Sequence, residues 1–350
     1  MVRTSSFIRR ALPGAALLGA LALLFALSGC SAVTVLLPPT GTPTLTPTHT
    51  STPTATPTNT PTITPTPTNS PTPPPTATPT TSPLTMTAQL EPATVLQGQV
   101  SVLIVRPSRE ARVTATLRGK PWPTFEEKGR WYALAGIWAT TAPGKWTITV
   151  KAEDPLGGPA ITQQLTLTVA ARKFDVEDVA MEDSAINLFA DQSAVQQEAN
   201  TVAAAVAPYT PERLWQGPFL QPIQGEVSST YGEARSYNGG PVSDRHSGLD
   251  LAADEGTPIA AANDGKVVFA GKLAVRGNCV IIDHGWGLYS GYYHMSAIKV
   301  PVGDIVKKGQ IIGLVGTTGF SNGPHLHWNF WLGGQIIDPA FMESWQLPDS

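Results

Sequence analysis

The chain has 350 residues, about twice the length of an ordinary single domain, so two folded units are the initial expectation. Only 14% of the residues are charged, and the formal net charge is −3. No run is rich in Lys or Arg, which argues against nucleic acid as a partner because phosphates demand a basic surface. Two cysteines, Cys30 and Cys279, are too few for a disulfide framework.

The first thirty residues have the pattern of an export signal. Three arginines precede an apolar run over residues 11–27, which ends in the sequence LSGC at residues 27–30. Small residues before a lone Cys favour a cleaved signal peptide over a membrane-spanning helix. LSGC resembles the bacterial lipobox. This resemblance implies that residues 1–29 are a lipoprotein signal peptide and that lipidated Cys30 anchors the exported protein to a bacterial membrane, on its extracytoplasmic face.

Residues 30–84 are predicted to be a disordered stalk. Between residues 38 and 83 the chain holds 15 Pro and 20 Thr, with isolated apolar residues that cannot nucleate a core. Polyproline II at 3.1 Å per residue would extend this tract to roughly 140 Å. It is either a stalk that lifts the folded part from the membrane or a spacer of unselected length, and in neither case a domain.

Residues 85–170 are predicted to form an immunoglobulin-like β-sandwich. Apolar residues alternate with period two, which indicates strands, in the segments QVSVLIV, ARVTATL, KWTITVK and LTLTV. Six or seven short strands without a helical period are typical of such a sandwich. We find no catalytic constellation here and expect a spacer or positioning module. Binding to the wall or to a partner is the alternative.

A short helical connector, residues 171–215, is expected to follow. Asp191 is a candidate N-cap for a helix over residues 192–207, and Pro208 and Pro211 would end it. We interpret this helix as a packing brace.

The chemistry is concentrated in the last part of the chain, residues 216–345. Five of the six histidines lie between His246 and His327, among short strand-like segments bounded by Gly. These segments predict a compact, largely antiparallel sheet domain.

Two short motifs in this domain favour a metal site. His325 and His327 are two apart in a strand and therefore project from one face. His246 and Asp250 are four apart, and the small Gly248 between them lets another group approach closely. Two His and one Asp match the count of protein ligands in zinc hydrolases, which leaves a fourth position for water. Taken alone, His246 and Asp250 could equally be a hydrogen-bonded surface pair.

Together the segments HSGLD, YYHMS and TGFSNGPHLH resemble the lysostaphin/LytM family of zinc endopeptidases, peptidase family twenty-three of the metallopeptidases. The similarity continues through YGEARSYN, GTPIAAANDGKVVFAG, VIIDHGWG and VGDIVKKGQIIGLVGTTG, over about residues 220–340. It implies a mainly β protein in which the sandwich is followed by a Gly-rich antiparallel catalytic domain with a duplicated-hybrid-like sheet.

The resemblance also implies roles for single residues. One Zn²⁺ would be bound by His246, Asp250 and His327. His294 and His325 would be the catalytic pair beside the metal, with base and acid not apportioned between them.

Tyr292 stands two residues before His294 and is therefore expected on the same face, where it would donate a hydrogen bond to the developing oxyanion. His284 receives no catalytic role, and Cys279 is expected to be a small buried residue. Asn329 stands where many family members carry Glu, so the outer partner of His327 is left open.

The implied function is a zinc-dependent endopeptidase that hydrolyses peptide crosslinks of bacterial peptidoglycan with a metal-activated water. Peptidoglycan stem peptides or crossbridges would be its partners, with cell-division or wall-remodelling proteins as further candidates. The alternative is an inactive envelope lipoprotein that activates a separate cell-wall amidase. Proteins of that kind lack metal ligands, whereas all three are present here.

Two other classes of protein agree less well with the sequence. GDIVKKGQIIGLVG also resembles the hairpin of a biotinyl or lipoyl carrier, but no modifiable Lys with flanking Met stands at a tight turn. A structural adhesive lipoprotein would leave the five clustered histidines unexplained.

The lipobox predicts that Cys30→Ser abolishes lipidation, because no thiol remains to accept the lipid. The variant should stay unprocessed or be released from the membrane, as measured by mass spectrometry and membrane fractionation. A variant that is still processed and partitions like the parent contradicts the lipoprotein interpretation.

Overall fold

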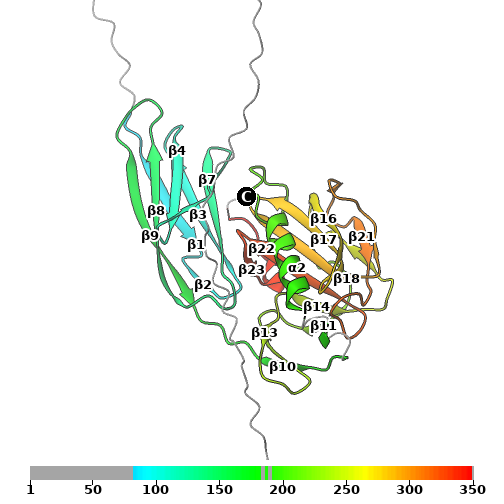
Figure 1. Ribbon diagram of the computed structural model, residues 1–350. Coiled ribbons are helices and arrows are strands. Elements are labelled where there is room, and N and C mark those ends of the chain that lie inside the picture. The colour runs from blue at the N-terminus through cyan, green and yellow to red at the C-terminus, as the bar shows by residue number, and fades with distance from the viewer. Residues whose placement is uncertain (1–81, 183–185, 188–190, 349–350) are drawn as a thin grey trace, which may run out of the picture. The chain divides into compact units, whose positions relative to one another are not determined.

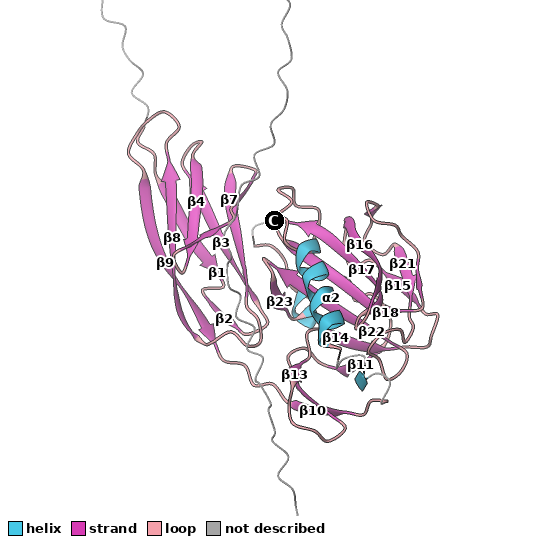
Figure 2. Ribbon diagram, viewed as in Figure 1, coloured by secondary structure: helices cyan, strands magenta, loops and turns pink. Residues whose placement is uncertain are grey.

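The computed structural model describes residues 82–182, 186–187 and 191–348 (Figure 1). The predicted signal peptide, Cys30 and nearly all of the predicted stalk lie outside the described residues. Strands dominate the described part, together with the helices α2 (Gln192–Ala205) and α3 (Pro339–Met342) (Figure 2). The mainly β class is therefore confirmed. None of the helices in the described ranges is long and apolar enough to cross a membrane.

The region predicted to be an immunoglobulin-like sandwich contains two sheets. One has the order β1 (Met86–Glu91), β3 (Val100–Pro107), β7 (Arg130–Gly136), β6 (Phe125–Glu127). The other has the order β2 (Thr94–Leu96), β9 (Ile161–Ala170), β8 (Gly144–Glu153), β4 (Arg112–Leu117), β5 (Lys120–Trp122). Buried side chains such as Leu103, Val113 and Ile148 form one cluster from strands of both sheets. The four segments with alternating apolar residues are β3, β4, β8 and β9, as expected.

A single large antiparallel sheet dominates the C-terminal part. Its order is β11 (Glu226–Ser229), β14 (Leu249–Ala252), β22 (His325–Leu332), β18 (Leu288–Met295), β17 (Gly277–Gly285), β16 (Gly265–Leu273), β20 (Ile305–Val306), with β23 (Gln335–Ile337) paired to β22. The expected antiparallel sheet of short, Gly-bounded strands is thus observed.

Two small sheets flank it. One has the order β15 (Pro258–Ala260), β21 (Ile311–Leu314), β19 (Ala297–Ile298). The other has the order β10 (Val176–Val179), β12 (Ala234–Tyr237), β13 (Asp244–Arg245). Because β10 pairs in parallel with β12, the predicted connector contributes a strand beside the C-terminal domain.

The two faces of the large sheet have different surroundings. On β22, Leu326, Trp328, Phe330 and Leu332 belong to the main core, which also includes Val102, Ile104 and Trp286. Residues of the two N-terminal sheets therefore pack into this core, and the described residues belong to one compact unit. The opposite face carries His325, His327, Asn329 and Trp331, as the period of two along a strand requires.

Helix α2 covers part of that second face (Figure 1). The side chain of Asp191 accepts hydrogen bonds from the backbone of Ser193 and Ala194, so the predicted N-cap is confirmed. The helix ends at Ala205, two residues before the predicted end. Its Val202 and Val206 lie in a buried cluster with sheet residues that include Cys279, Tyr289, Tyr293 and Trp331.

His284 is a fully buried histidine at the end of β17. Its Nδ1 lies 2.7 Å from the carbonyl oxygen of Asp264, and its Nε2 lies 2.8 Å from the hydroxyl of Ser290. Burial lowers the pKa of His284 to about 4. An unfolded histidine has a pKa near 6.5, so between these two values the unfolded chain binds a proton that the folded chain does not.

The free energy of unfolding should therefore fall as the pH is lowered through this window. In His284→Gln the fall should be shallower, by at most about 1.4 kcal/mol per pH unit, because one proton no longer distinguishes the two states. Urea unfolding of the metal-free parent and variant, from about pH 7 to about pH 4.5, measures the difference. Parallel pH profiles would contradict the assignment of a neutral buried imidazole.

Candidate metal centre

Three predicted ligands meet where strands β14 and β22 pair. Asp250 on β14 lies directly opposite His327 on β22 in the antiparallel register. His246 lies in the turn between β13 and β14, four residues before Asp250. At Gly248, in the same turn, a Cβ would lie 2.3 Å from the carbonyl oxygen of Trp328 and 2.6 Å from His327 Nε2. The turn approaches β22 this closely only because Gly has no side chain.

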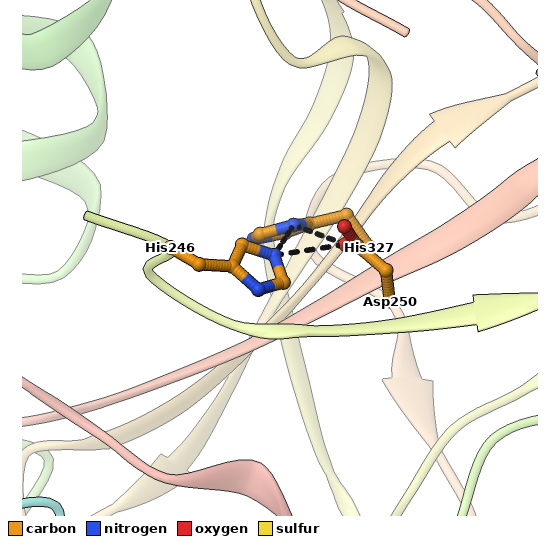
Figure 3. A group of neighbouring side chains, drawn as sticks. All are labelled: His246, Asp250 and His327. Carbon is orange, nitrogen blue, oxygen red and sulfur yellow. Dashed lines mark hydrogen bonds and ion pairs between the residues drawn. The ribbon is translucent and has the colours of Figure 1, made fainter. Parts of the chain in front are cut away.

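The ligand atoms form a compact triangle (Figure 3). Asp250 Oδ1 lies 2.7 Å from His327 Nδ1 and 3.0 Å from His246 Nε2, and the two nitrogens are 3.1 Å apart. Ligands at about 2.0–2.1 Å from a tetrahedral Zn²⁺ are roughly 3.3 Å apart. The observed edges are slightly shorter but close to that value, so the triangle fits a small divalent cation.

The tautomer of His246 also suits a metal. Its Nδ1 lies 2.8 Å from the carbonyl oxygen of Thr230, which can only accept, so Nδ1 carries the hydrogen. The Nε2 atom faces Asp250 and His327, where its lone pair would be available to a metal ion. A hydrogen bond from the non-ligating nitrogen of a histidine to a carbonyl is the usual outer contact of a metal ligand.

Asp250 is held as a carboxylate. Burial by itself would raise its pKa, but the imidazoles of His246 and His327 hold the pKa well below its usual range. Its second oxygen, Oδ2, accepts a hydrogen bond of 2.9 Å from the guanidinium of Arg235 on β12. Arg235 was not among the predicted site residues, because nothing in its local sequence shows which carboxylate it pairs with.

His294 and His325 lie beside this triangle. Their ring centroids are 4.8 Å apart, and His325 Nε2 lies 3.9 Å from Asp250 Oδ1. Each Nδ1 is 2.8 Å from a backbone carbonyl oxygen, that of Thr318 for His294 and that of Gly323 for His325. Both Nδ1 atoms therefore carry hydrogen, and in the neutral form of each ring the lone pair is on Nε2.

Burial keeps the imidazoles of His294 and His327 neutral. Burial first, and then the nearby His325 and His327, lower the pKa of His294 to about 3. Burial is also the main cause that lowers the pKa of His327 to about 4. At neutral pH His294 and His327 are therefore neutral in the metal-free chain, and each can accept a proton or bind a metal ion.

A β-bulge brings His294 to this face. The register changes between the pairs Asn278–Met295 and Val280–Tyr292, so Tyr293 and His294 together oppose the single residue Cys279. His294 has a φ of 60°, the left-handed conformation. Tyr293 and His294 therefore both reach the face of the metal ligands, although they are consecutive.

The prediction for Tyr292 is wrong. Its side chain is fully buried on the opposite face, where its hydroxyl accepts a hydrogen bond of 2.8 Å from the backbone of Ala262. The prediction assumed regular alternation between residues 292 and 294, and the bulge breaks that alternation. The tyrosine that contacts a ligand is instead Tyr293, whose ring stacks on His327 with centroids 5.0 Å apart and planes at 5°.

The remaining singled-out residues have structural positions. Cys279 is fully buried, as expected, and burial raises its pKa to about 12. Asn329 Nδ2 donates a hydrogen bond of 2.7 Å to the carbonyl oxygen of Ser247. The Ser247 hydroxyl lies 3.4 Å from His327 Nε2, so Asn329 supports the turn that supplies an outer contact of His327.

A pocket of about 370 Å³ opens over the centre. Asp250, His294, His325 and His327 line it together with residues 320–324 and with Glu177, Val179, Met181, Arg235 and Tyr237. The connector thus supplies part of the wall. Met181 is fixed by two backbone hydrogen bonds to the side chain of Asn238, and the Ala180 carbonyl accepts one from Asn322. Sequence patterns gave no indication of this contribution.

Comparisons with known proteins point to one family. The model of Peptidase family M23 matches residues 244–339. DD-carboxypeptidase/endopeptidase Mpg of Neisseria meningitidis serogroup B is 44% identical over 95 residues, which are 27% of this chain and 22% of Mpg. Peptidoglycan DD-endopeptidase ShyA of Vibrio cholerae is 38% identical over 115 residues, which are 32% of this chain and 26% of ShyA. This chain therefore spans about a quarter of the length of these two relatives.

A solved structure shows a more extensive likeness. An M23 peptidase candidate from Pseudomonas aeruginosa is 29% identical, and the alignment covers 72% of this chain and 96% of that chain with a TM-score of 0.53. The likeness thus extends beyond the residues that the family model matches. The matched segment contains the three clustered ligands and both neighbouring histidines, and residues 244–339 accordingly form a domain of Peptidase family M23.

Proposed function

We propose that the chain is a zinc-dependent endopeptidase that hydrolyses peptide crosslinks of bacterial peptidoglycan. The observation that carries this proposal is a cluster of three ligand atoms with two further imidazoles beside it, at a pocket that four of these five residues line. Structural metal sites in proteins are usually closed by four protein ligands, whereas three leave a position open for chemistry. Among the residues that the structure describes, the group of clustered ligands here has three members.

Two imidazoles and one carboxylate form a donor set that suits Zn²⁺. When bound, Zn²⁺ would polarise the scissile carbonyl and lower the pKa of a coordinated water to about 7. His246, Asp250 and His327 would hold the ion. Arg235 and the Thr230 carbonyl would keep two of these ligands in the required orientation and protonation state.

His294 and His325 would move the protons. Each has its Nδ1–H fixed by a carbonyl, so its Nε2 accepts a proton from the attacking water and delivers it to the leaving amide nitrogen. In its protonated form either residue donates a hydrogen bond to the carbonyl oxygen on which negative charge develops. The side chains are close enough to share these roles, and the geometry favours neither order.

The relatives support the substrate class. ShyA is a peptidoglycan DD-endopeptidase, and Mpg is a DD-carboxypeptidase/endopeptidase. Peptidoglycan lies outside the cytoplasmic membrane, which agrees with the export signal and the LSGC sequence. We therefore place the enzyme in the cell envelope, anchored by lipidated Cys30. Because all three ligands and both histidines are present, we prefer catalysis to the alternative of an inactive activator of a separate amidase.

Substitution of the five residues separates metal binding from proton transfer. In His246→Ala, Asp250→Ala and His327→Ala, only two protein ligands remain, so zinc affinity should fall by orders of magnitude. In His294→Ala and His325→Ala, the zinc content should stay near one equivalent while turnover falls by about 10²–10⁴. Elemental analysis and mass identification of fragments released from purified peptidoglycan measure both quantities.

Tyr292→Phe is the matched control. Its hydroxyl lies on the opposite face of the sheet, so its loss should leave zinc content and turnover near those of the parent. The ligand assignment fails if His325→Ala loses zinc while His327→Ala keeps it. If all five variants bind zinc and cleave normally, the proposed enzyme mechanism fails.

A further inference from the structure

A buried ion pair links helix α2 to the large sheet. The carboxylate of Glu198, at the centre of the helix, is only 3% exposed. It accepts hydrogen bonds from the backbone of Val275 at 2.7 Å and from the backbone of Arg276 at 3.3 Å. The Arg276 guanidinium donates to it at 2.5 Å. Removing such a charge from water is costly, and a purely apolar contact would hold a helix at least as well.

Arg276 in turn contacts both residues at the bulge of β18. Its guanidinium carbon lies 5.1 Å from the centroid of the Tyr293 ring. Its carbonyl oxygen accepts a hydrogen bond of 3.0 Å from the backbone of His294. One residue, fixed by Glu198, therefore supports the tyrosine and the left-handed histidine that follows it.

Tyr293 links Arg276 to the metal centre, because it contacts both Arg276 and the ligand His327. Its ring lies parallel to the His327 imidazole, 5.0 Å away, and it belongs to the buried cluster that includes Val202 and Trp331. The direction of the His327 Nδ1 lone pair depends on the rotation of that imidazole ring. The stacked ring on one face and the Ser247 hydroxyl 3.4 Å from Nε2 restrict this rotation. Metal affinity is sensitive to such outer contacts.

We propose that Glu198 is a positioning residue of the metal centre, which acts through Arg276 and Tyr293 on the orientation of His327 and on the backbone of His294. Helix α2 is then part of the catalytic apparatus rather than only the packing brace predicted from the sequence. This inference rests on the proposed function, because it concerns the same metal centre.

Metal affinity provides a test that does not depend on cleavage. The dissociation constant for Zn²⁺ is measured on the whole mature chain by competition with a chromophoric chelator, and the ligand geometry is followed in the absorption bands of the Co²⁺ form. Glu198→Ala and Tyr293→Leu should weaken Zn²⁺ binding about 10- to 100-fold and change the Co²⁺ bands. Tyr293→Phe keeps the stacked ring and should bind Zn²⁺ within about threefold of the parent.

Glu127→Ala is the matched control for a lost ion pair. Glu127 pairs with Arg213, and neither residue lines the pocket. This variant should lose stability in thermal unfolding without a change in Zn²⁺ affinity. If Glu198→Ala behaves in the same way as Glu127→Ala, the ion pair is only a brace and the inference is overturned.

If Glu198→Ala does not fold, the inference is tested by comparing Tyr293→Leu with Tyr293→Phe. Equal Zn²⁺ affinity and identical Co²⁺ spectra for Tyr293→Leu and Tyr293→Phe would overturn the inference, while the proposed function would stand. A parent chain that binds no metal would instead overturn the proposed function, and this inference with it.

Discussion

The antiparallel pairing of β14 with β22 is the constraint on which the site depends. It places Asp250 directly opposite His327, so that two ligands from residues far apart in the sequence meet without a loop between them. Side chains in a directly opposed pair lie about 4.5–5.5 Å apart at Cβ, within the reach of a single ion. A register shift of one residue would turn one of the two ligands to the other face and destroy the centre.

The two faces of the large sheet have different roles: one packs into the hydrophobic core, and the other carries the candidate metal centre. The core face is filled with Leu326, Trp328 and Phe330, which hold β22 in place between its neighbours. The other face has the polar centre at one end and helix α2 over another part. At the bulge of β18, next to His294, side chains no longer alternate regularly between the two faces of the sheet. Its left-handed backbone brings a second catalytic candidate to the polar face, and the hydrogen bonds of Arg276 and Thr318 offset the strain.

Parts of the chain outside residues 244–339 complete the centre. Arg235 pairs with Asp250 from β12, and β10 adds Glu177 beside it. Glu198 reaches the bulge from α2. These residues precede the segment that the family model matches, yet one of them pairs with a ligand and another contacts the residues beside the centre. The predicted connector is therefore joined to the C-terminal domain by specific polar contacts, which a mere linker does not need.

The sequence alone determined the β-rich class and the N-cap of α2, because period and capping are local properties. The set of five residues at the centre was instead implied by the resemblance of its motifs to the lysostaphin/LytM family. The sequence could not show that Tyr292 faces the core, since one extra residue in a strand reverses every later side chain and a bulge has no fixed sequence pattern. Nor could it pair Glu198 with Arg276 or Arg235 with Asp250. From sequence alone, charged residues are expected to be exposed to solvent. Only tertiary packing decides which of them are buried, and a buried charge is stable only when it is paired with an opposite charge.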